Sequence, residues 1–206
     1  MKKVIIVGAG SVGKFLAYNS NQFTDTFEFI GFLDDDIKKH NKIIAGIPVL
    51  GSIDMLPNYI HENIAVAWGI AFPKIKAQIV AKFADVKADY PIFISKKAWI
   101  SNEVTIGPGA IIYPGCSINY ETKIGAFVVM NMNCAIGHNV TISDFCSLAP
   151  GVNLGGHTKI EERTEMGIGS ATKQNIKISH DCIIGGQAMV VKNVSCFDTI
   201  KGVPAR

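Results

Sequence analysis

Histidine is the side chain most often used as a general base near neutral pH, and the chain contains five histidines. They are His40 and His61 in the first half, and His138, His157 and His180 in the second. His138 is followed by an amide residue, Asn139, and a glycine pair, Gly155-Gly156, comes directly before His157. An imidazole beside a closely approaching backbone N–H would supply a base and an oxyanion donor, which are the two groups that acyl transfer requires.

A six-residue register organises the second half of the chain. Every sixth residue from Ile100 to Val190 is apolar except Thr172, and a small or compact side chain lies two residues before each of them. Two inward positions in six residues fit neither the 3.6-residue period of a helix nor simple strand alternation. The pattern predicts a hexapeptide-repeat parallel β-helix, in which three hexads form a coil of 18 residues and the chain makes about five coils. Residues 18 apart should then lie in columns.

The columns bring candidate site residues together. Gly156 falls in the column of His138, and we expect its N–H to be the oxyanion donor. Tyr120 falls on the other side of His138, where it would line an acceptor pocket. Glu121 falls in the column of Asn139, so we expect Glu121 to orient His138 either directly or through Asn139.

The other histidines have weaker positions for chemistry. His157 shares the column of Asn139. In an acyl transfer at His138, we expect His157 to touch either the acceptor molecule or the cofactor that donates the acyl group. His180 falls on a different face and is expected to be structural, and solvated side chains are expected for His40 and His61. Because no two of the three histidines in the coil share a column, the sequence does not predict a three-histidine metal site within one subunit.

The first half contains a glycine-rich turn in a nucleotide-binding context. A buried-strand run at 3–7 leads into Gly8-Ala9-Gly10-Ser11-Val12-Gly13, after which Lys14–Tyr18 can continue as a helix. A second strand, Phe27–Leu33, is followed by the three aspartates Asp34, Asp35 and Asp36. They lie about 20 residues beyond the last glycine, where a Rossmann half places its ribose-binding acid. Strand, glycine turn and helix present free N–H groups to a phosphate. Gly8, Gly10, Ser11, Gly13, Asp34 and Asp35 are therefore the expected substrate-binding residues.

The α/β segment is too short for a complete dinucleotide domain. We predict a turn at Gly46–Pro48, a strand near Ile64–Trp68, a helix near Pro73–Phe83 and a strand at Pro91–Ile94. This is one mononucleotide-binding half, whereas a nicotinamide dehydrogenase normally needs two. The sequence thus predicts a truncated Rossmann-like domain over residues 1–94, which binds one nucleotide, and a β-helix domain with a C-terminal tail over residues 95–206.

Composition is that of a cytoplasmic enzyme. The net charge is +3, and no basic run with interleaved aromatics indicates nucleic-acid binding. No apolar stretch is long enough to insert into a membrane. Four of the five cysteines, Cys116, Cys134, Cys146 and Cys182, occupy small inward positions of the repeat, which favours burial over disulfides or a zinc site.

Three segments together with the repeats resemble a known family. They are Gly31–Asp36 (GFLDDD), Gly46–Gly51 (GIPVLG) and the terminal Gly202–Arg206 (GVPAR). The chain is similar to bacterial sugar acetyltransferases of the sialic acid O-acetyltransferase type, a group that includes N-acetyltransferases of UDP-4-amino sugars. The resemblance implies a left-handed β-helix and transfer of acetyl from acetyl-CoA to a sugar, usually nucleotide-linked, without a metal. It also implies a homotrimer with cofactor clefts between neighbouring β-helices, and contacts from Asp34 and Asp35 to the nucleotide.

The resemblance also assigns roles within the β-helix. His138 aligns with the catalytic base, although Asn139 replaces the acidic residue that usually follows it. Ser147 stands where the family often carries a second histidine that helps to hold the thioester. The residues expected at the cofactor are Ser147, Gly155, Gly156, His157 and Arg206.

Two other classes of function are alternatives. One is an oxidoreductase that binds a nicotinamide nucleotide at the glycine turn, and the other is a non-catalytic trimeric assembly subunit. The sequence leaves open the identity of the sugar and of its nucleotide, and whether oxygen or nitrogen is acetylated.

Overall fold

The computed structural model describes residues 1–60 and 64–206, so His61 lies outside the described residues. The chain divides into two compact units, one formed by residues 1–71 and 78–91 and the other by residues 72–77 and 92–206. Helix α3 (Pro73–Lys82) contributes its first part to the second unit and its last part to the first. The sequence-based division placed a single boundary after residue 94.

The first unit contains a five-stranded sheet in the order β3-β4-β2-β1-β5. Its strands are β1 (Lys2–Val7), β2 (Phe27–Leu33), β3 (Ile43–Ile44), β4 (Ile47–Gly51) and β5 (Ile64–Trp68). Strands β1, β2, β4 and β5 are parallel, and the side chains of Val4–Val7 in β1, which has a strand on either side, are fully buried. The carboxyl ends of β1, β2 and β5 therefore meet at one edge, where a half-Rossmann unit binds its ligand.

The helices of this unit are short. They are α1 (Ser11–Tyr18), α2 (Leu56–Tyr59) and the 3₁₀ turns at Ser20–Gln22, Ile37–Lys39 and Ile53–Met55. Among the described residues, no helix is both long enough and apolar enough to cross a bilayer.

The segment near residue 46 differs from the expected turn. Strands β3 and β4 form an antiparallel hairpin in which Ile44 faces Ile47. Ala45 and Gly46 both have positive φ angles, 50° and 82°, as a tight two-residue hairpin turn requires. The turn therefore lies at residues 45–46, and Ile47-Pro48 belong to a strand.

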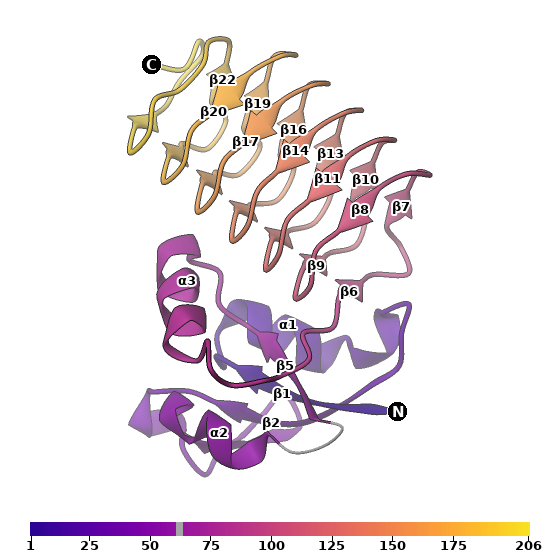
Figure 1. The fold of residues 1–206 in the computed structure, drawn as a ribbon, viewed down its shortest axis with the longest axis vertical. Coiled ribbons are helices and arrows are strands. Elements are labelled where there is room, and N and C mark those ends of the chain that lie inside the picture. The colour runs from indigo at the N-terminus through magenta and orange to yellow at the C-terminus, as the bar shows by residue number, and fades with distance from the viewer. Residues whose placement is uncertain (61–63) are drawn as a thin grey trace. The chain divides into compact units, whose positions relative to one another are not determined.

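The second unit is a solenoid of two-residue strands arranged as three parallel sheets (Figure 1). Face A contains β7 (Trp99–Ile100), β10 (Ser117–Ile118), β13 (Ala135–Ile136), β16 (Asn153–Leu154), β19 (Ala171–Thr172) and β22 (Met189–Val190). Face B contains β8 (Thr105–Ile106), β11 (Lys123–Ile124), β14 (Thr141–Ile142), β17 (Lys159–Ile160) and β20 (Lys177–Ile178). Face C contains β6 (Phe93–Ile94), β9 (Ile111–Ile112), β12 (Val129–Met130), β15 (Ser147–Leu148), β18 (Glu165–Met166), β21 (Ile183–Ile184) and β23 (Thr199–Ile200).

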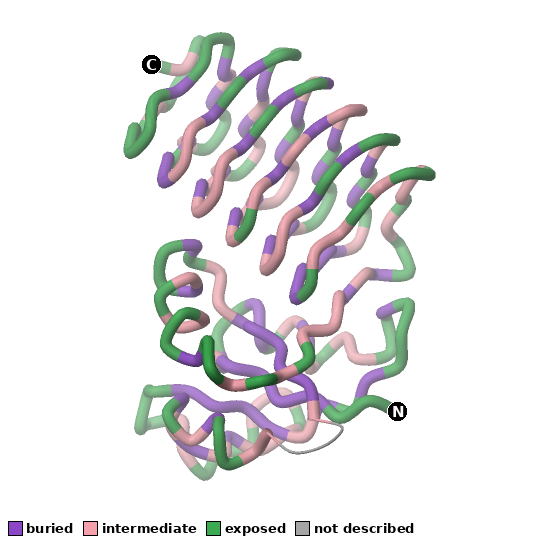
Figure 2. The backbone as a smooth tube through the Cα atoms, in the orientation of Figure 1, coloured by how far each residue is buried: buried purple, intermediate pink, exposed green. Residues whose placement is uncertain are grey.

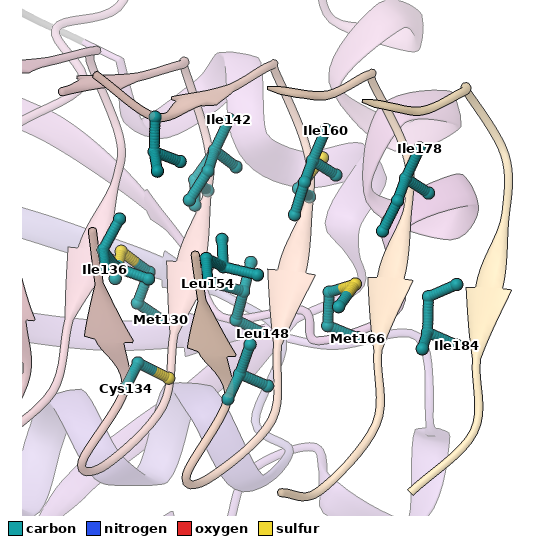
Figure 3. Packing of buried hydrophobic residues seen from close by; sticks show 14 of the residues in the cluster. Met130, Cys134, Ile136, Ile142, Leu148, Leu154, Ile160, Met166, Ile178 and Ile184 are labelled. Atoms are coloured by element: carbon teal, nitrogen blue, oxygen red, sulfur yellow. The ribbon is translucent and has the colours of Figure 1, made fainter. Parts of the chain in front are cut away.

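Strand register confirms the 18-residue coil. Ile118 pairs with Ile136, and Ile124 with Ile142, in each case one coil along the chain. The second residue of each strand points into the prism, where the apolar side chains stack in rows (Figure 3). Figure 2 shows the same alternation of buried and exposed positions along every coil. Thr172, the one polar residue in the row, is buried, and its hydroxyl accepts a hydrogen bond from the Gly155 N–H.

The β-helix extends beyond the predicted repeats at both ends. The sequence analysis assigned the strand at 91–94 to the α/β domain, but β6 pairs with β9 inside face C. Ile94 lies six residues before Ile100, so it is in register with the repeats. At the other end, β23 pairs with β21 after an interruption of the hexads.

Three corners connect the faces, and corner AB, which joins face A to face B, carries the histidines of interest. At each turn of this corner the third residue adopts the left-handed conformation, which directs the chain around the prism. Glu121, Asn139 and His157 have φ angles of 55°, 58° and 60°. The repeating backbone thus places consecutive columns of side chains on the outside of the same edge.

Candidate functional site

His138 lies at corner AB between β13 and β14, with its side chain on the outside of the prism. Its Nδ1 lies 2.8 Å from Oδ1 of Asn139. The Nδ2 group of Asn139 in turn donates to Oε2 of Glu121, one coil away. The column arithmetic predicted this juxtaposition of Glu121, Asn139 and His138.

The Asn139 side chain determines the tautomer of His138. A carboxylate only accepts hydrogen bonds, so the amide of Asn139 must direct its Nδ2 group toward Glu121 and its Oδ1 toward the ring. Since Oδ1 can only accept, the proton of neutral His138 is on Nδ1. The Nε2 atom is then unprotonated and is the basic atom of the ring.

Gly156 lies directly against Nε2 of His138. A Cβ atom built on Gly156 would be 2.9 Å from this nitrogen, closer than such contacts normally are. Among the described residues, no acceptor receives a hydrogen bond from the Gly156 N–H, whereas the N–H groups of its neighbours Gly155 and His157 bond to Thr172 and His138. The unprotonated Nε2 atom and a residue with an uncommitted peptide N–H therefore lie at the same corner.

Two more rings surround the imidazole. Tyr120 stacks on His138 with ring centroids 5.3 Å apart and an interplanar angle of 12°. His157 meets the His138 ring edge-on, at 5.0 Å and 90°. The predicted proximity of Tyr120 to His138 is therefore observed, and His157, which was expected in the column of Asn139, also contacts the His138 ring.

A shallow groove of about 490 Å³ runs along face A beside this corner. Its floor consists mainly of the small outward side chains of consecutive coils, and Trp99 lines one end. Gly137 and Gly155 border the groove next to His138. An elongated ligand with one end at the imidazole would fit along this face.

Two expected cofactor contacts are not near His138 within one chain. Ser147 lies on face C, where it pairs with Val129 and Glu165, so a face and not a corner of the prism carries it. Arg206 pairs with Lys201 through backbone hydrogen bonds at the last coil. Neither residue contributes to the cluster around the imidazole.

The glycine turn of the first unit has the geometry of a ligand loop. Gly8 (φ 97°) follows β1, and its N–H donates to the carbonyl of Leu33 at the end of β2. A Cβ atom on Gly13 would lie 2.0 Å from the Gly8 carbonyl oxygen, so this position requires glycine. Gly10 precedes α1 without a side-chain cap and has open space around it, and Ser11 is the first residue of the helix. The N-terminus of α1 can therefore receive an anion.

The aspartates after β2 are committed to their own backbone. Asp34 accepts hydrogen bonds from the N–H groups of Ala9 and Asp36 and forms an ion pair with Lys39 at 2.9 Å. Burial alone would raise the pKa of Asp34, but these hydrogen bonds hold the pKa below its usual value. Asp35 accepts from the N–H of Ile53. Both carboxylates therefore shape the loop in this structure, whereas the sequence analysis expected them to contact the nucleotide.

Sequence reasoning missed two residues at this loop. Lys39 neutralises Asp34, and Nε2 of His40 donates to the carbonyl oxygen of Asp34 at 2.7 Å. The sequence analysis expected His40 to be solvated, but this ring is a structural part of the loop. Both residues follow the Asp34–Asp36 segment closely in the sequence, and this closeness could have predicted their contacts with it.

His180 belongs to an ion-pair network at corner BC, which joins face B to face C. Its Nδ1 lies 2.8 Å from Asp181, whose carboxylate also receives Nε and Nη2 of Arg163. The hydrogen bonds from Arg163 lower the pKa of Asp181 despite its burial. The structural role expected for His180 agrees with this network. Within residues 1–60 and 64–206, no three histidine, cysteine, aspartate or glutamate side chains gather in a metal-binding arrangement.

Comparisons with known proteins cover both units. Residues 3–83 match the PglD N-terminal domain. No curated protein sequence matches the chain. The acetyltransferase domain of PglB from Neisseria gonorrhoeae FA1090, in complex with acetyl coenzyme A, superimposes with a TM-score of 0.89 at 25% identity, covering 100% of this chain and 98% of that chain.

Two other solved structures have the same fold along their whole length. WeeI from Acinetobacter baumannii AYE gives a TM-score of 0.86 at 25% identity, covering 100% of this chain and 99% of that one. PerB from Caulobacter crescentus, in complex with CoA and GDP-perosamine, gives a TM-score of 0.90 at 23% identity, covering 100% of this chain and 97% of that one. Residues 3–83 thus match the PglD N-terminal domain, and the whole chain has the fold of the PglB acetyltransferase domain and of PerB, in agreement with the resemblance found in the sequence.

Proposed function

We propose that this protein transfers the acetyl group of acetyl-CoA to an amino or hydroxyl group of a nucleotide-linked sugar, with His138 as the general base. The observation that carries the proposal is the position of Gly156, whose Cα side lies against the Nε2 atom of His138 and whose N–H makes no hydrogen bond within the described residues. The similarity to the PglB domain and to PerB supports acetyl-CoA and a nucleotide sugar as the two substrates.

The reaction follows from these two groups. The acceptor nitrogen or oxygen attacks the thioester carbonyl carbon while Nε2 of His138 takes its proton. The carbonyl oxygen becomes an oxyanion, which the Gly156 N–H stabilises. When the tetrahedral intermediate collapses, the C–S bond breaks, and the imidazolium returns the proton to the CoA sulfur. No protein nucleophile and no metal take part.

Each ligand has residues that suit it. The nucleotide would bind at Gly8–Gly13, where Gly10 and Ser11 present the N-terminus of α1 to the phosphates. Asp34 and Asp35 hold the loop that borders this site. The acetyl-CoA arm would follow the groove of face A past Gly155 and His157. Acetyl-CoA is a cytoplasmic metabolite, so we place the reaction in the cytoplasm.

We further propose that the active unit is a homotrimer. Met132, Pro150 and Ile168 stack one coil apart at corner CA, which joins face C to face A. Met132 and Ile168 are exposed large apolar side chains in the isolated chain, and such a row is typical of a subunit interface. A neighbouring subunit would also bring its face C, with Ser147, toward a groove that Ser147 cannot reach within its own chain.

Release of free thiol tests the activity. The purified protein is mixed with acetyl-CoA and a panel of UDP-, GDP-, CMP- and dTDP-linked amino and hydroxy sugars, and CoA thiol is followed with a chromogenic disulfide. We expect release with one class of acceptor and its loss in His138→Ala, with His180→Ala as the matched control at another corner. Light scattering should give the mass of three chains.

The alternatives predict other results. A nicotinamide oxidoreductase would be stabilised against heat by NAD(P)H and not by nucleotide sugars, since ligands stabilise the folded state that binds them. A non-catalytic assembly subunit would form trimers, bind neither substrate and be unaffected by His138→Ala. Either result would refute the proposed activity.

A further inference from the structure

The imidazole of His138 has an unusual partner set for a base that must become a cation. In the described part of the chain, its only side-chain hydrogen bond is to Asn139, which is neutral. The carboxylate of Glu121 is one residue further away and bonds to the amide rather than to the ring. The positive charge that forms on the ring during transfer is therefore not compensated by a directly hydrogen-bonded anion.

Tyr120 occupies one face of the same ring. The two rings are nearly parallel, at 12°, with centroids 5.3 Å apart. The face of an aromatic ring is electron-rich and attracts a cation that lies within about 6 Å of its centroid. Tyr120 is 45% exposed, so its ring is not needed to fill the core of the β-helix.

The columns explain why the stack forms. Tyr120, His138 and Gly156 are each 18 residues apart and therefore lie at the same place in three consecutive coils. The aromatic ring covers His138 from one side, whereas Gly156 leaves the Nε2 side without a side chain. Substrates can approach Nε2 from the glycine side while the tyrosine remains in contact with the ring.

We propose that Tyr120 is a positioning residue whose ring face stabilises the imidazolium of His138, in the place of a directly bonded carboxylate. This inference rests on the proposed acetyltransferase activity. It differs from the expectation that Tyr120 lines the acceptor pocket, because it assigns to Tyr120 a contact with the His138 ring rather than with the acceptor.

The pH dependence of the rate separates the two roles. In Tyr120→Leu the protonated ring loses a stabilising partner, so the midpoint of the acidic limb of kcat should move to lower pH by about half a unit. The plateau of kcat should also fall, by roughly three- to tenfold, because the same charge forms in the transition state. Tyr120→Phe keeps the aromatic face and should retain both the midpoint and the plateau.

A matched control comes from another corner. Phe127 and Phe145 also stack one coil apart, with centroids 5.1 Å apart and an angle of 20°. Phe127→Leu removes a stacked ring without touching His138 and should leave the pH profile unchanged. Thermal unfolding of all variants shows that each is folded.

The outcomes are distinct. If the wild type releases no thiol with any acceptor, the proposed activity itself fails. If it is active but Tyr120→Leu keeps the wild-type midpoint, or Tyr120→Phe shifts it as leucine does, the ring face does not support the charge and the inference is overturned. A shift in Tyr120→Leu alone supports it.

Discussion

Asn139 connects Glu121 to His138: its Nδ2 donates to the carboxylate, and its Oδ1 accepts from Nδ1 of the ring. The sequence has an amide where the acetyltransferases that it resembles usually carry an acid, and a glutamate one coil earlier. The anion in this chain is therefore one residue further from the ring than an acid at position 139 would be. This arrangement fixes the ring but keeps the negative charge from direct contact with it.

Exchanging the two side-chain types tests this arrangement. Glu121→Gln should lower kcat roughly tenfold, because the amide chain loses its anion. Asn139→Asp alone should also be impaired, since it sets two carboxylates within hydrogen-bond distance of each other. The double variant Glu121→Gln/Asn139→Asp should recover the activity, because the introduced aspartate then accepts from the ring and from the introduced glutamine. The measurement is a double-mutant cycle on kcat.

Additive losses in that cycle would contradict the arrangement, as they would mean that the residues act independently. Glu103→Gln is the control. Glu103 lies one coil before Glu121 at the same corner and has the same left-handed conformation. Its substitution should leave kcat unchanged.

Gly156 should tolerate no side chain. Its φ is not in the left-handed region, so only the contact with His138 requires glycine. In Gly156→Ala the new Cβ would lie 2.9 Å from Nε2 and 3.0 Å from Cε1, and the ring held by Asn139 would have to move. We expect kcat to fall at least about tenfold, as a small displacement of a reacting group does, with little change in the melting temperature.

Gly186→Ala is the comparison at corner CA, with light scattering to show that the variant keeps the wild-type mass, because Gly186 lies in the column of Met132, Pro150 and Ile168. Its added Cβ would meet only the carbonyl oxygen of Ile168, at 3.3 Å, and the Ile168 nitrogen at 3.8 Å. Comparable losses of activity in both variants would indicate a general effect on the β-helix instead of a local one at His138.

Periodicity predicted the β-helix because the same inward apolar position recurs in every hexad. Each inward isoleucine reports the same local geometry, so even Thr172 did not obscure the register. Column arithmetic then predicted Gly156 and Glu121 beside His138 and Asn139. The strand at Phe93–Ile94 was misassigned because a single apolar pair before the first full repeat resembles the end of an α/β domain.

The loop residues show what a sequence cannot supply. Asp34 and Asp35 stand where ribose-binding acids occur, but their carboxylates accept hydrogen bonds from Ala9 and Ile53. Whether an acid is free or is used by nearby backbone depends on the path of the loop. In the same way, the helical pattern of Pro73–Lys82 gave no sign that Lys76 is buried.

Asp34 should stabilise the first unit in a pH-dependent way. Its pKa is lowered on folding, so its contribution is present above the unfolded value of 3.8 and is lost as the pH falls through the lower folded value. Asp34→Asn should reduce the free energy of unfolding near neutral pH, and the difference from wild type should shrink as the pH approaches about 3. The measurement is urea unfolding at several pH values, with the exposed Asp25→Asn as control. A difference that stays constant with pH would show that the carboxylate charge is not what holds the loop.

Lys76 should make the protein less stable at neutral pH than in mild base. Its side chain is fully buried, and its Nζ has no hydrogen-bond partner among residues 1–60 and 64–206. Burial lowers the pKa of Lys76 to about 7, although the nearby Cys146 acts in the opposite direction. Between pH 7 and the unfolded value of 10.5, the unfolded chain binds a proton that the folded chain does not, so this residue makes stability rise with pH.

Lys76→Met should remove that dependence. The variant should be more stable than wild type at about pH 7, by a few kcal/mol at most, because an apolar side chain of similar length has no charge to desolvate. The advantage should diminish toward about pH 10 as the wild-type amine no longer resists burial. Lys82→Met, at an exposed position of the same helix, controls for loss of a positive charge. The comparison uses urea unfolding of both variants and wild type from about pH 6 to 10, and an advantage of Lys76→Met that did not change with pH would mean that the folded Lys76 amine stays protonated.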